Sequence, residues 1–178
     1  TRARREPIYE VTQPKGTGEV HPALSPNDEF ANFEIWDKSN LGGNQATTEA
    51  MLPGSYARSA LKAGLALDQK LGANPFKFGM IGSTDSHTGL STSAEDNFFG
   101  KHTGNEPTPQ GKDRVTPAMD MGTGLGRFNW QYLAGGYAGV WAKANTRGAI
   151  FDALMRKEVY ATTGPRMTVR VFGGWDFT

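Results

Sequence analysis

Apolar residues recur at helical spacing in two stretches of this chain. Over residues 55–71, small and apolar side chains fall on one stripe and polar side chains fall opposite. Gly72 follows this stretch, as is typical of the C-terminal end of a helix. A second stretch begins at a capping residue, Asn145 or Thr146, and runs to about residue 157. The pattern therefore predicts two helices in these two places.

Short runs of β-branched and aromatic residues predict strands around these helices. The first is residues 8–12, and the second, residues 76–82, follows the longer helix directly. Further candidates lie toward the C-terminus, at residues 138–142, 159–162 and 167–172, the last with alternating apolar and polar positions. A helix, a short loop, a strand and a polar loop in succession are half of a repeating α/β unit. We therefore expect an α/β fold.

Glycine and proline are abundant, with 23 and 10 residues among 178. Many of them fall in residues 16–45 and 90–126, which show no sustained period and predict long irregular loops. Loops are where binding and catalytic residues are often placed. The length suffices for one domain with a sizeable core, so residues 1–178 are predicted to form a single domain.

Charge and composition exclude several classes of function. The chain has 19 Lys and Arg residues against 18 Asp and Glu residues, and this balance predicts binding neither to nucleic acid nor to a membrane surface. It has no cysteine, which rules out disulfides, thiolate metal sites and cysteine nucleophiles. No apolar run reaches the roughly 18 residues that a membrane span requires.

The strongest chemical signal is the run Gly-Ser-Thr-Asp-Ser-His at residues 82–87. It places Asp85 and His87 in a polar loop directly after a predicted buried strand, and in α/β folds ligands and metals lie at the carboxyl ends of strands. If the backbone is extended there, both side chains point to the same side. A carboxylate oxygen and an imidazole nitrogen together suit Mn²⁺, Zn²⁺ or Fe²⁺. The alternative is that both residues only cap a turn, since the Asp-x-His spacing is common.

The same run resembles the last metal motif of the PHP (polymerase and histidinol phosphatase) superfamily. Over nearly its whole length the chain is similar to the C-terminal part of the PHP-like domain-of-unknown-function family 3604. The segments that carry this resemblance are residues 9–11, 15–19, 24–30, 74–79, 95–101, 139–142 and 156–166.

The resemblance implies the C-terminal portion of a distorted (β/α)7 barrel with a cluster of two or three metal ions. It implies Asp85 and His87 as metal ligands and a small phosphorylated substrate. PHP sites also open with a His-x-His motif, which this sequence lacks. We therefore expect the chain to be an incomplete part of a larger metallohydrolase, with the missing N-terminal part as its partner. Residues 1–178 alone are expected to aggregate or to stay molten.

Other polar residues are candidates for the same site. Lys101 and Arg166 lie in or after loops and are expected to bind a phosphate group. His102 is a candidate proton donor. Further candidate metal ligands lie near the first strand and in the loop after it: Glu10, Glu19 and His21. The alternative for each of these residues is a solvated or ion-paired side chain without a role in function.

Three functions are compatible with these residues. The first is a metal-dependent phosphoesterase that hydrolyses phosphate mono- or diesters with a metal-activated water. The second is metal-assisted hydrolysis at a carbon centre, which a cationic phosphate pocket would disfavour. The third is a non-catalytic structural or interaction module of a nicked or truncated protein. A periplasmic or secreted location is slightly favoured over the cytoplasm, and the absence of cysteine is compatible with it.

Overall fold

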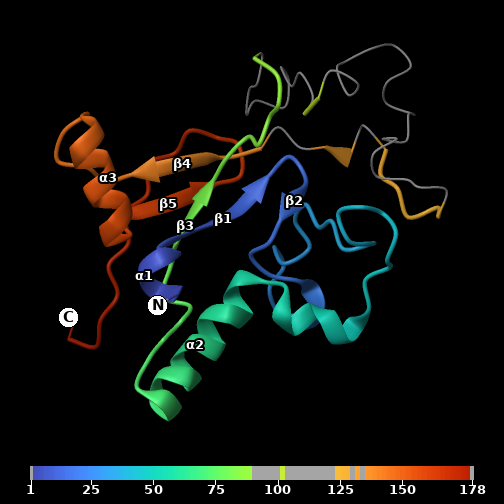
Figure 1. Cartoon of the computed structure of the whole chain (residues 1–178), viewed down its shortest axis with the longest axis horizontal. Helices are drawn as coiled ribbons and strands as arrows, with labels where there is room; N and C mark the ends of the chain where they lie inside the picture. The colour runs from blue at the N-terminus through green and yellow to red at the C-terminus, as the bar shows by residue number, and fades with distance from the viewer. Residues whose placement is uncertain (1, 90–100, 103–122, 129–130, 133–134, 177–178) are drawn as a thin grey trace.

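A β-α-β unit forms the centre of the molecule (Figure 1). β1 (Ile8–Gln13) leads through a long connection into helix α2 (Ala57–Leu71), and α2 leads into β3 (Gly79–Gly82). β3 pairs with β1 in parallel, and β2 (Gly16–Thr17) pairs antiparallel with the other edge of β1. The computed structural model describes residues 2–89, 101–102, 123–128, 131–132 and 135–176.

A second, two-stranded sheet lies beside β3. β4 (Tyr137–Val140) and β5 (Val159–Thr162) pair antiparallel and are joined by helix α3 (Arg147–Arg156). The Thr146 hydroxyl caps α3 by accepting a hydrogen bond from the Ala149 N–H at 3.3 Å. β5 contacts β3, with α3 at the far side of β4 and β5 in Figure 1.

Glycine permits the close approach of β5 to β3. A Cβ atom at Gly82 would lie 2.7 Å from the Thr162 carbonyl oxygen and 2.9 Å from the Tyr137 carbonyl oxygen. A Cβ atom at Gly79 would lie 2.7 Å from the Val159 side chain. Only residues without a side chain fit between the two sheets at these points.

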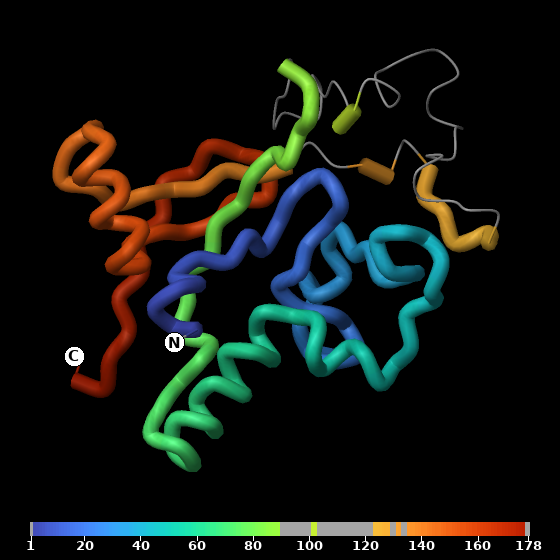
Figure 2. Tube along the Cα trace, viewed as in Figure 1, coloured from blue at the N-terminus to red at the C-terminus, as the bar shows by residue number. Residues whose placement is uncertain are grey.

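The connection between β2 and α2 folds back to one side of β1, as Figure 2 shows. It contains two 3-10 helices, η1 (Pro22–Leu24) and η2 (Glu49–Gly54), while a short helix, α1 (Arg2–Arg5), precedes β1. Its apolar residues supply much of the core, together with β1: Val11, Val20, Ala31, Leu52 and Tyr56 are buried. The loop that was predicted over residues 16–45 is therefore largely confirmed, with short elements inside it.

The predicted helices and most predicted strands are confirmed. α2 begins at Ala57 instead of residue 55 because the preceding residues form η2. The strand predicted over residues 76–82 begins only at Gly79, because a turn occupies residues 75 and 76. The longest predicted loop, residues 90–126, lies almost wholly outside the described residues.

The strand predicted over residues 167–172 is wrong, since no strand is formed over residues 163–176. Two backbone carbonyl groups of this segment accept hydrogen bonds from side chains instead of from a neighbouring strand. The Tyr160 hydroxyl donates to the Met167 carbonyl at 2.9 Å, and the Trp141 indole donates to the Val169 carbonyl at 3.0 Å. Alternation alone does not supply the second strand that a ladder requires.

The apolar stripe of α2 is only partly covered by the described residues. Ala57 and Gly64 are buried, whereas Leu65 and Leu71 are 69% and 67% exposed. In the part of the chain that the structure describes, no helix is long and apolar enough to span a membrane.

Candidate functional site

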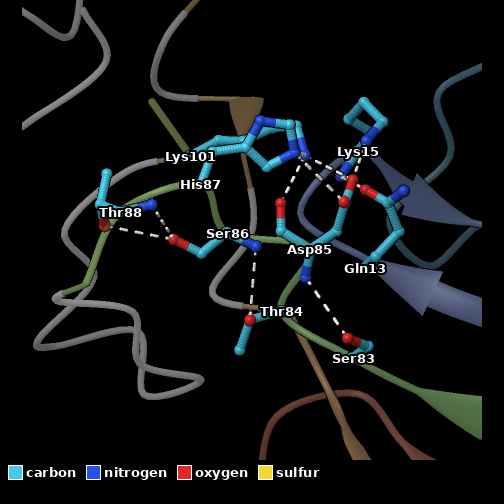
Figure 3. A network of polar contacts seen from close by, with 9 residues as sticks. All are labelled: Gln13, Lys15, Ser83, Thr84, Asp85, Ser86, His87, Thr88 and Lys101. Carbon is cyan, nitrogen blue, oxygen red and sulfur yellow. Dashed lines mark hydrogen bonds and ion pairs between the residues drawn. The ribbon is translucent and has the colours of Figure 1, made fainter. Parts of the chain in front are cut away.

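The loops after β1 and β3 meet at one edge of the central sheet. Because the two strands are parallel neighbours, their carboxyl ends point the same way, and the residues that follow them come together. Lys15 follows β1 and Asp85 follows β3, and the Lys15 ammonium forms an ion pair with Oδ2 of Asp85 (Figure 3).

A second lysine contacts the same carboxylate. The side chain of Lys101 is only 4% exposed, and its Nζ contacts Asp85 Oδ2 and lies 3.3 Å from Nε2 of His87. The backbone N–H of His87 donates to the Lys101 carbonyl oxygen at 2.7 Å, which fixes Lys101 beside the loop after β3. We call Lys15, Asp85, His87, Lys101 and His102 the Asp85 cluster.

Asp85 and His87 converge by a different route from the one predicted. The expected backbone was extended, but Asp85 has a φ of 43°, in the left-handed region. The loop is held by short-range hydrogen bonds, such as that from the Asp85 N–H to the Ser83 hydroxyl at 3.4 Å. His87 Nε2 consequently lies 3.5 Å from Asp85 Oδ1.

The Asp85 cluster carries an excess of positive charge. Burial opposes ionisation of Asp85, but hydrogen bonds from Lys101 and Lys15 outweigh it and hold the pKa of this carboxyl well below its usual range. Burial and the neighbouring Lys15 lower the pKa of Lys101, while Asp85 opposes this shift. Among the described residues of the cluster, two ammonium groups face one carboxylate, and this excess of positive charge favours an anionic ligand.

Two histidines complete the Asp85 cluster. The rings of His87 and His102 meet edge to face, with their centroids 4.3 Å apart. Burial and the nearby His87 and Lys101 lower the pKa of His102, so its imidazole carries less positive charge than that of an ordinary histidine at the same pH. The expected proton donor thus lies beside the candidate metal ligands.

The geometry around Asp85 suits a cation. Asp85 and His87 present an oxygen and a nitrogen 3.5 Å apart, and the Lys101 ammonium already contacts both residues. This ammonium stands in for the positive charge that a divalent ion would supply. Among the described residues, no group of three or more His, Asp or Glu side chains could hold a metal ion. Asp85 and His87 therefore fit a metal as two of its ligands, and further ligands would come from elsewhere.

None of the three weaker ligand candidates lies in the Asp85 cluster, and two of them make other contacts. Glu10 is exposed on β1. Glu19 accepts hydrogen bonds from the guanidinium of Arg58 at 2.7 and 3.0 Å. His21 Nε2 lies 2.9 Å from Asp37 Oδ2, and its Nδ1 accepts a hydrogen bond from the Ala23 N–H at 3.1 Å. Both nitrogens of His21 are thus engaged within the connection between β2 and α2.

Arg166 lies after β5, apart from the contacts just described. Its guanidinium lies 5.1 Å from the centroid of the Tyr137 ring, and its side chain is exposed. It lines a shallow hollow together with Tyr160 and Thr162. No contact within the described residues ties it to the Asp85 cluster, so its expected phosphate contact stays a prediction.

Lys15 is the member of the Asp85 cluster that sequence reasoning missed. It falls in the run Pro-Lys-Gly at residues 14–16, between β1 and β2. Its position could have predicted its role, because it directly follows a strand whose parallel neighbour leads into the Asp-x-His loop. That prediction needs the strand pairing, which the sequence does not state.

Comparison with known proteins identifies a family for the whole chain. Residues 1–178 match the family described as "Protein of unknown function (DUF3604)". No curated protein and no solved structure matches the sequence.

Proposed function

We propose that this chain, which belongs to the family described as "Protein of unknown function (DUF3604)", carries part of the site of a metal-dependent phosphoesterase. Asp85 and His87 would be two of the metal ligands, and Lys15 and Lys101 would bind the phosphate group. The substrate class is a phosphate monoester or diester.

One observation carries the proposal: two lysine ammonium groups flank a candidate metal-binding carboxylate at the carboxyl end of a parallel strand pair. A phosphoryl group carries negative charge on several oxygens, so its transfer is helped most by fixed positive charge around it. Lysine binds phosphate as a point charge, and the ion pairs with Asp85 show that both ammonium groups reach the place where the metal would be bound. The site therefore supports phosphate better than a neutral ester or amide.

Each residue of the proposed site would have a separate role in binding the phosphate group. Lys101 is almost fully buried, so its charge acts with little screening by water. Lys15 is 14% exposed in its side chain and reaches the same point from the neighbouring strand end. A bound Mn²⁺, Zn²⁺ or Fe²⁺ ion would supply Lewis-acid polarisation of the phosphoryl oxygen and activation of the attacking water.

We also propose that the chain belongs to the PHP superfamily and forms part of a (β/α)7 barrel. The parallel pair of β1 and β3, with α2 between them in the sequence, would be one unit of such a barrel. The exposed apolar residues of α2, Leu65 and Leu71, would pack against further elements of the barrel.

Two other functions make different predictions for the same residues. Metal-assisted hydrolysis at a carbon centre does not need two lysines beside the metal ligands, and the charge of the Asp85 cluster disfavours it. A non-catalytic module needs no hydrolytic activity at all. Turnover of a carboxylic ester alone would indicate the first of these functions, and no turnover of any ester would indicate the second.

The test is hydrolysis of p-nitrophenyl phosphate, bis-p-nitrophenyl phosphate and p-nitrophenyl acetate by the full-length protein with added Mn²⁺ or Zn²⁺. We expect turnover of a phosphate ester in excess over the acetate. Lys101→Met should lower kcat/KM by about 100-fold, because it removes a buried charge next to the reacting group. The control is Lys62→Met on the exposed face of α2. Equal loss in both variants, or turnover of the acetate alone, contradicts the proposal.

A further inference from the structure

Arg127 is a buried arginine that forms no ion pair with a carboxylate among the residues that the structure describes. It is 6% exposed. Its guanidinium stacks on the indole of Trp36, 5.4 Å from the ring centroid. Burial lowers the pKa of Arg127, and Asp37 opposes this only from a distance. Guanidinium groups stay protonated in proteins, so a positive charge is held here.

Buried charges in proteins are almost always paired, because an unpaired charge loses its hydration and gains nothing in return. The guanidinium carries several N–H donors in one plane, and a contact with the ring of Trp36 does not use a hydrogen-bond acceptor. Such a planar fork matches the two oxygens of a carboxylate or a phosphate. Since no carboxylate of the described residues pairs with Arg127, an oxyanion of a ligand would suit its guanidinium.

Arg127 lines a cavity of about 180 Å³ with Lys15, Trp36, Asn40 and Leu41. Lys15 is the lysine that also contacts Asp85, so the cavity adjoins the Asp85 cluster. Two cationic side chains and an aromatic face are thus gathered around a space of the size of one anionic group.

Hydrogen bonds within one loop and between distant segments fix the walls of this cavity. The Ser39 hydroxyl donates to the Leu125 carbonyl at 3.1 Å, and the Trp36 indole donates to the Gln131 carbonyl at 3.0 Å. The amide of Asn40 donates to Asn44 and accepts from the Asn44 and Gln45 N–H groups. A pocket with braced walls is preorganised for a ligand and loses little entropy on binding.

We infer that this cavity, which we call the Arg127 pocket, is a subsite for an oxyanion of the ligand, held by Arg127 and Lys15. In combination with the proposed function, on which this step rests, the substrate is a phosphate ester that carries a second anionic group. One group lies at the Asp85 cluster and the other in the Arg127 pocket, and Lys15 stands between them.

The first test measures the binding of inorganic phosphate to the full-length protein. The fluorescence of Trp36 is the signal that reports binding. The signal of Trp36 is isolated by comparison with Trp36→Phe. We expect a saturable change, with affinity lowered about 10-fold or more in Arg127→Gln, because a charge-assisted bidentate contact is lost. The matched control is Arg170→Gln, since Arg170 also stacks on a tryptophan, 4.9 Å from the centroid of Trp141, but is exposed.

A second variant tests the same inference in case the Arg127→Gln protein does not fold. Leu41 lines the Arg127 pocket and is 62% exposed, so Leu41→Glu adds a repelling carboxylate at a position that tolerates polar residues. It should also weaken phosphate binding, while Leu65→Glu, at a 69% exposed position on α2, should not. Wild-type affinity in both Arg127→Gln and Leu41→Glu, or no saturable change at Trp36, overturns the inference.

Hydrolysis measurements separate this inference from the proposed function. A series of alkanediol bisphosphates of increasing length is compared with the matching monophosphates, and the wild-type protein should prefer at least one bisphosphate. In Arg127→Gln, the kcat/KM for that bisphosphate relative to the kcat/KM for the matching monophosphate should fall to about 1. Phosphate binding at Trp36 without hydrolysis of any ester would contradict the phosphoesterase alone, and hydrolysis with no preference at any length would contradict the second anionic group.

Discussion

Lys15 and Asp85 lie 70 residues apart in the sequence, and their side chains form an ion pair at the carboxyl ends of two parallel strands. Lys101 joins the same carboxylate from a third segment. Three separate parts of the chain are thus tied together at one oxygen of Asp85. The first prediction concerns the stability of this connection.

Asp85→Asn should lower the free energy of unfolding by about 1–3 kcal/mol, because it leaves the buried ammonium of Lys101 without its counter-ion. Lys15→Met should cost less, since Lys101 still pairs with the carboxylate. In urea denaturation, the double variant should be less destabilised than the sum of the two single variants. Strict additivity would mean that Lys15 and Asp85 do not interact in solution.

The packing of β3 against β5 gives a second prediction. Gly82→Ala should destabilise the protein by about 1–3 kcal/mol, because its Cβ would meet backbone carbonyl oxygens of Thr162 and Tyr137 that cannot move independently. It should also disturb the loop that carries Asp85. Gly148→Ala in α3 is the control, since its Cβ meets nothing within 4 Å and alanine favours a helix. A thermal melt in which the two variants match would contradict the close approach of the strands.

The order of elements could be predicted from the sequence, whereas the site could be predicted only in part. Helix α2 follows from its apolar stripe and its terminal glycine, and α3 from Thr146 as its cap. The convergence of Asp85 and His87 was expected, but from extended backbone instead of the left-handed turn that the structure has at Asp85. Asp is a residue that tolerates the left-handed region, but its presence alone does not distinguish such a turn from extended backbone.

The residues that sequence reasoning missed share one cause. The importance of Lys15 and Arg127 depends on contacts with residues that are distant in the sequence. No local sequence pattern predicts these contacts. The strand predicted over residues 167–172 was wrong for the same reason, because its partners are side chains of Tyr160 and Trp141 instead of a strand. Tertiary contacts of this kind override local propensity.

A third prediction concerns Glu19, which is a candidate metal ligand by sequence and an ion-pair partner of Arg58 in the structure. Arg58 also pairs with Asp28 and lowers the pKa of that carboxyl. Glu19→Gln should leave the metal content unchanged and lower stability by no more than about 1 kcal/mol, as is usual for exposed ion pairs. Arg58→Met should raise the pKa of Asp28 toward its ordinary value in an NMR titration. Loss of metal in Glu19→Gln would restore Glu19 as a ligand.

The central claim is that Asp85 and His87 bind a divalent metal ion. The most direct measurement is elemental mass spectrometry on the purified full-length protein and on an Asp85→Ala/His87→Ala variant, with a Glu19→Gln variant as the control. The account predicts near-stoichiometric Mn, Zn or Fe in the wild-type and control proteins and its loss in the double variant. Metal that is retained in the double variant, or absent from the folded wild-type protein after incubation with each ion, would contradict it.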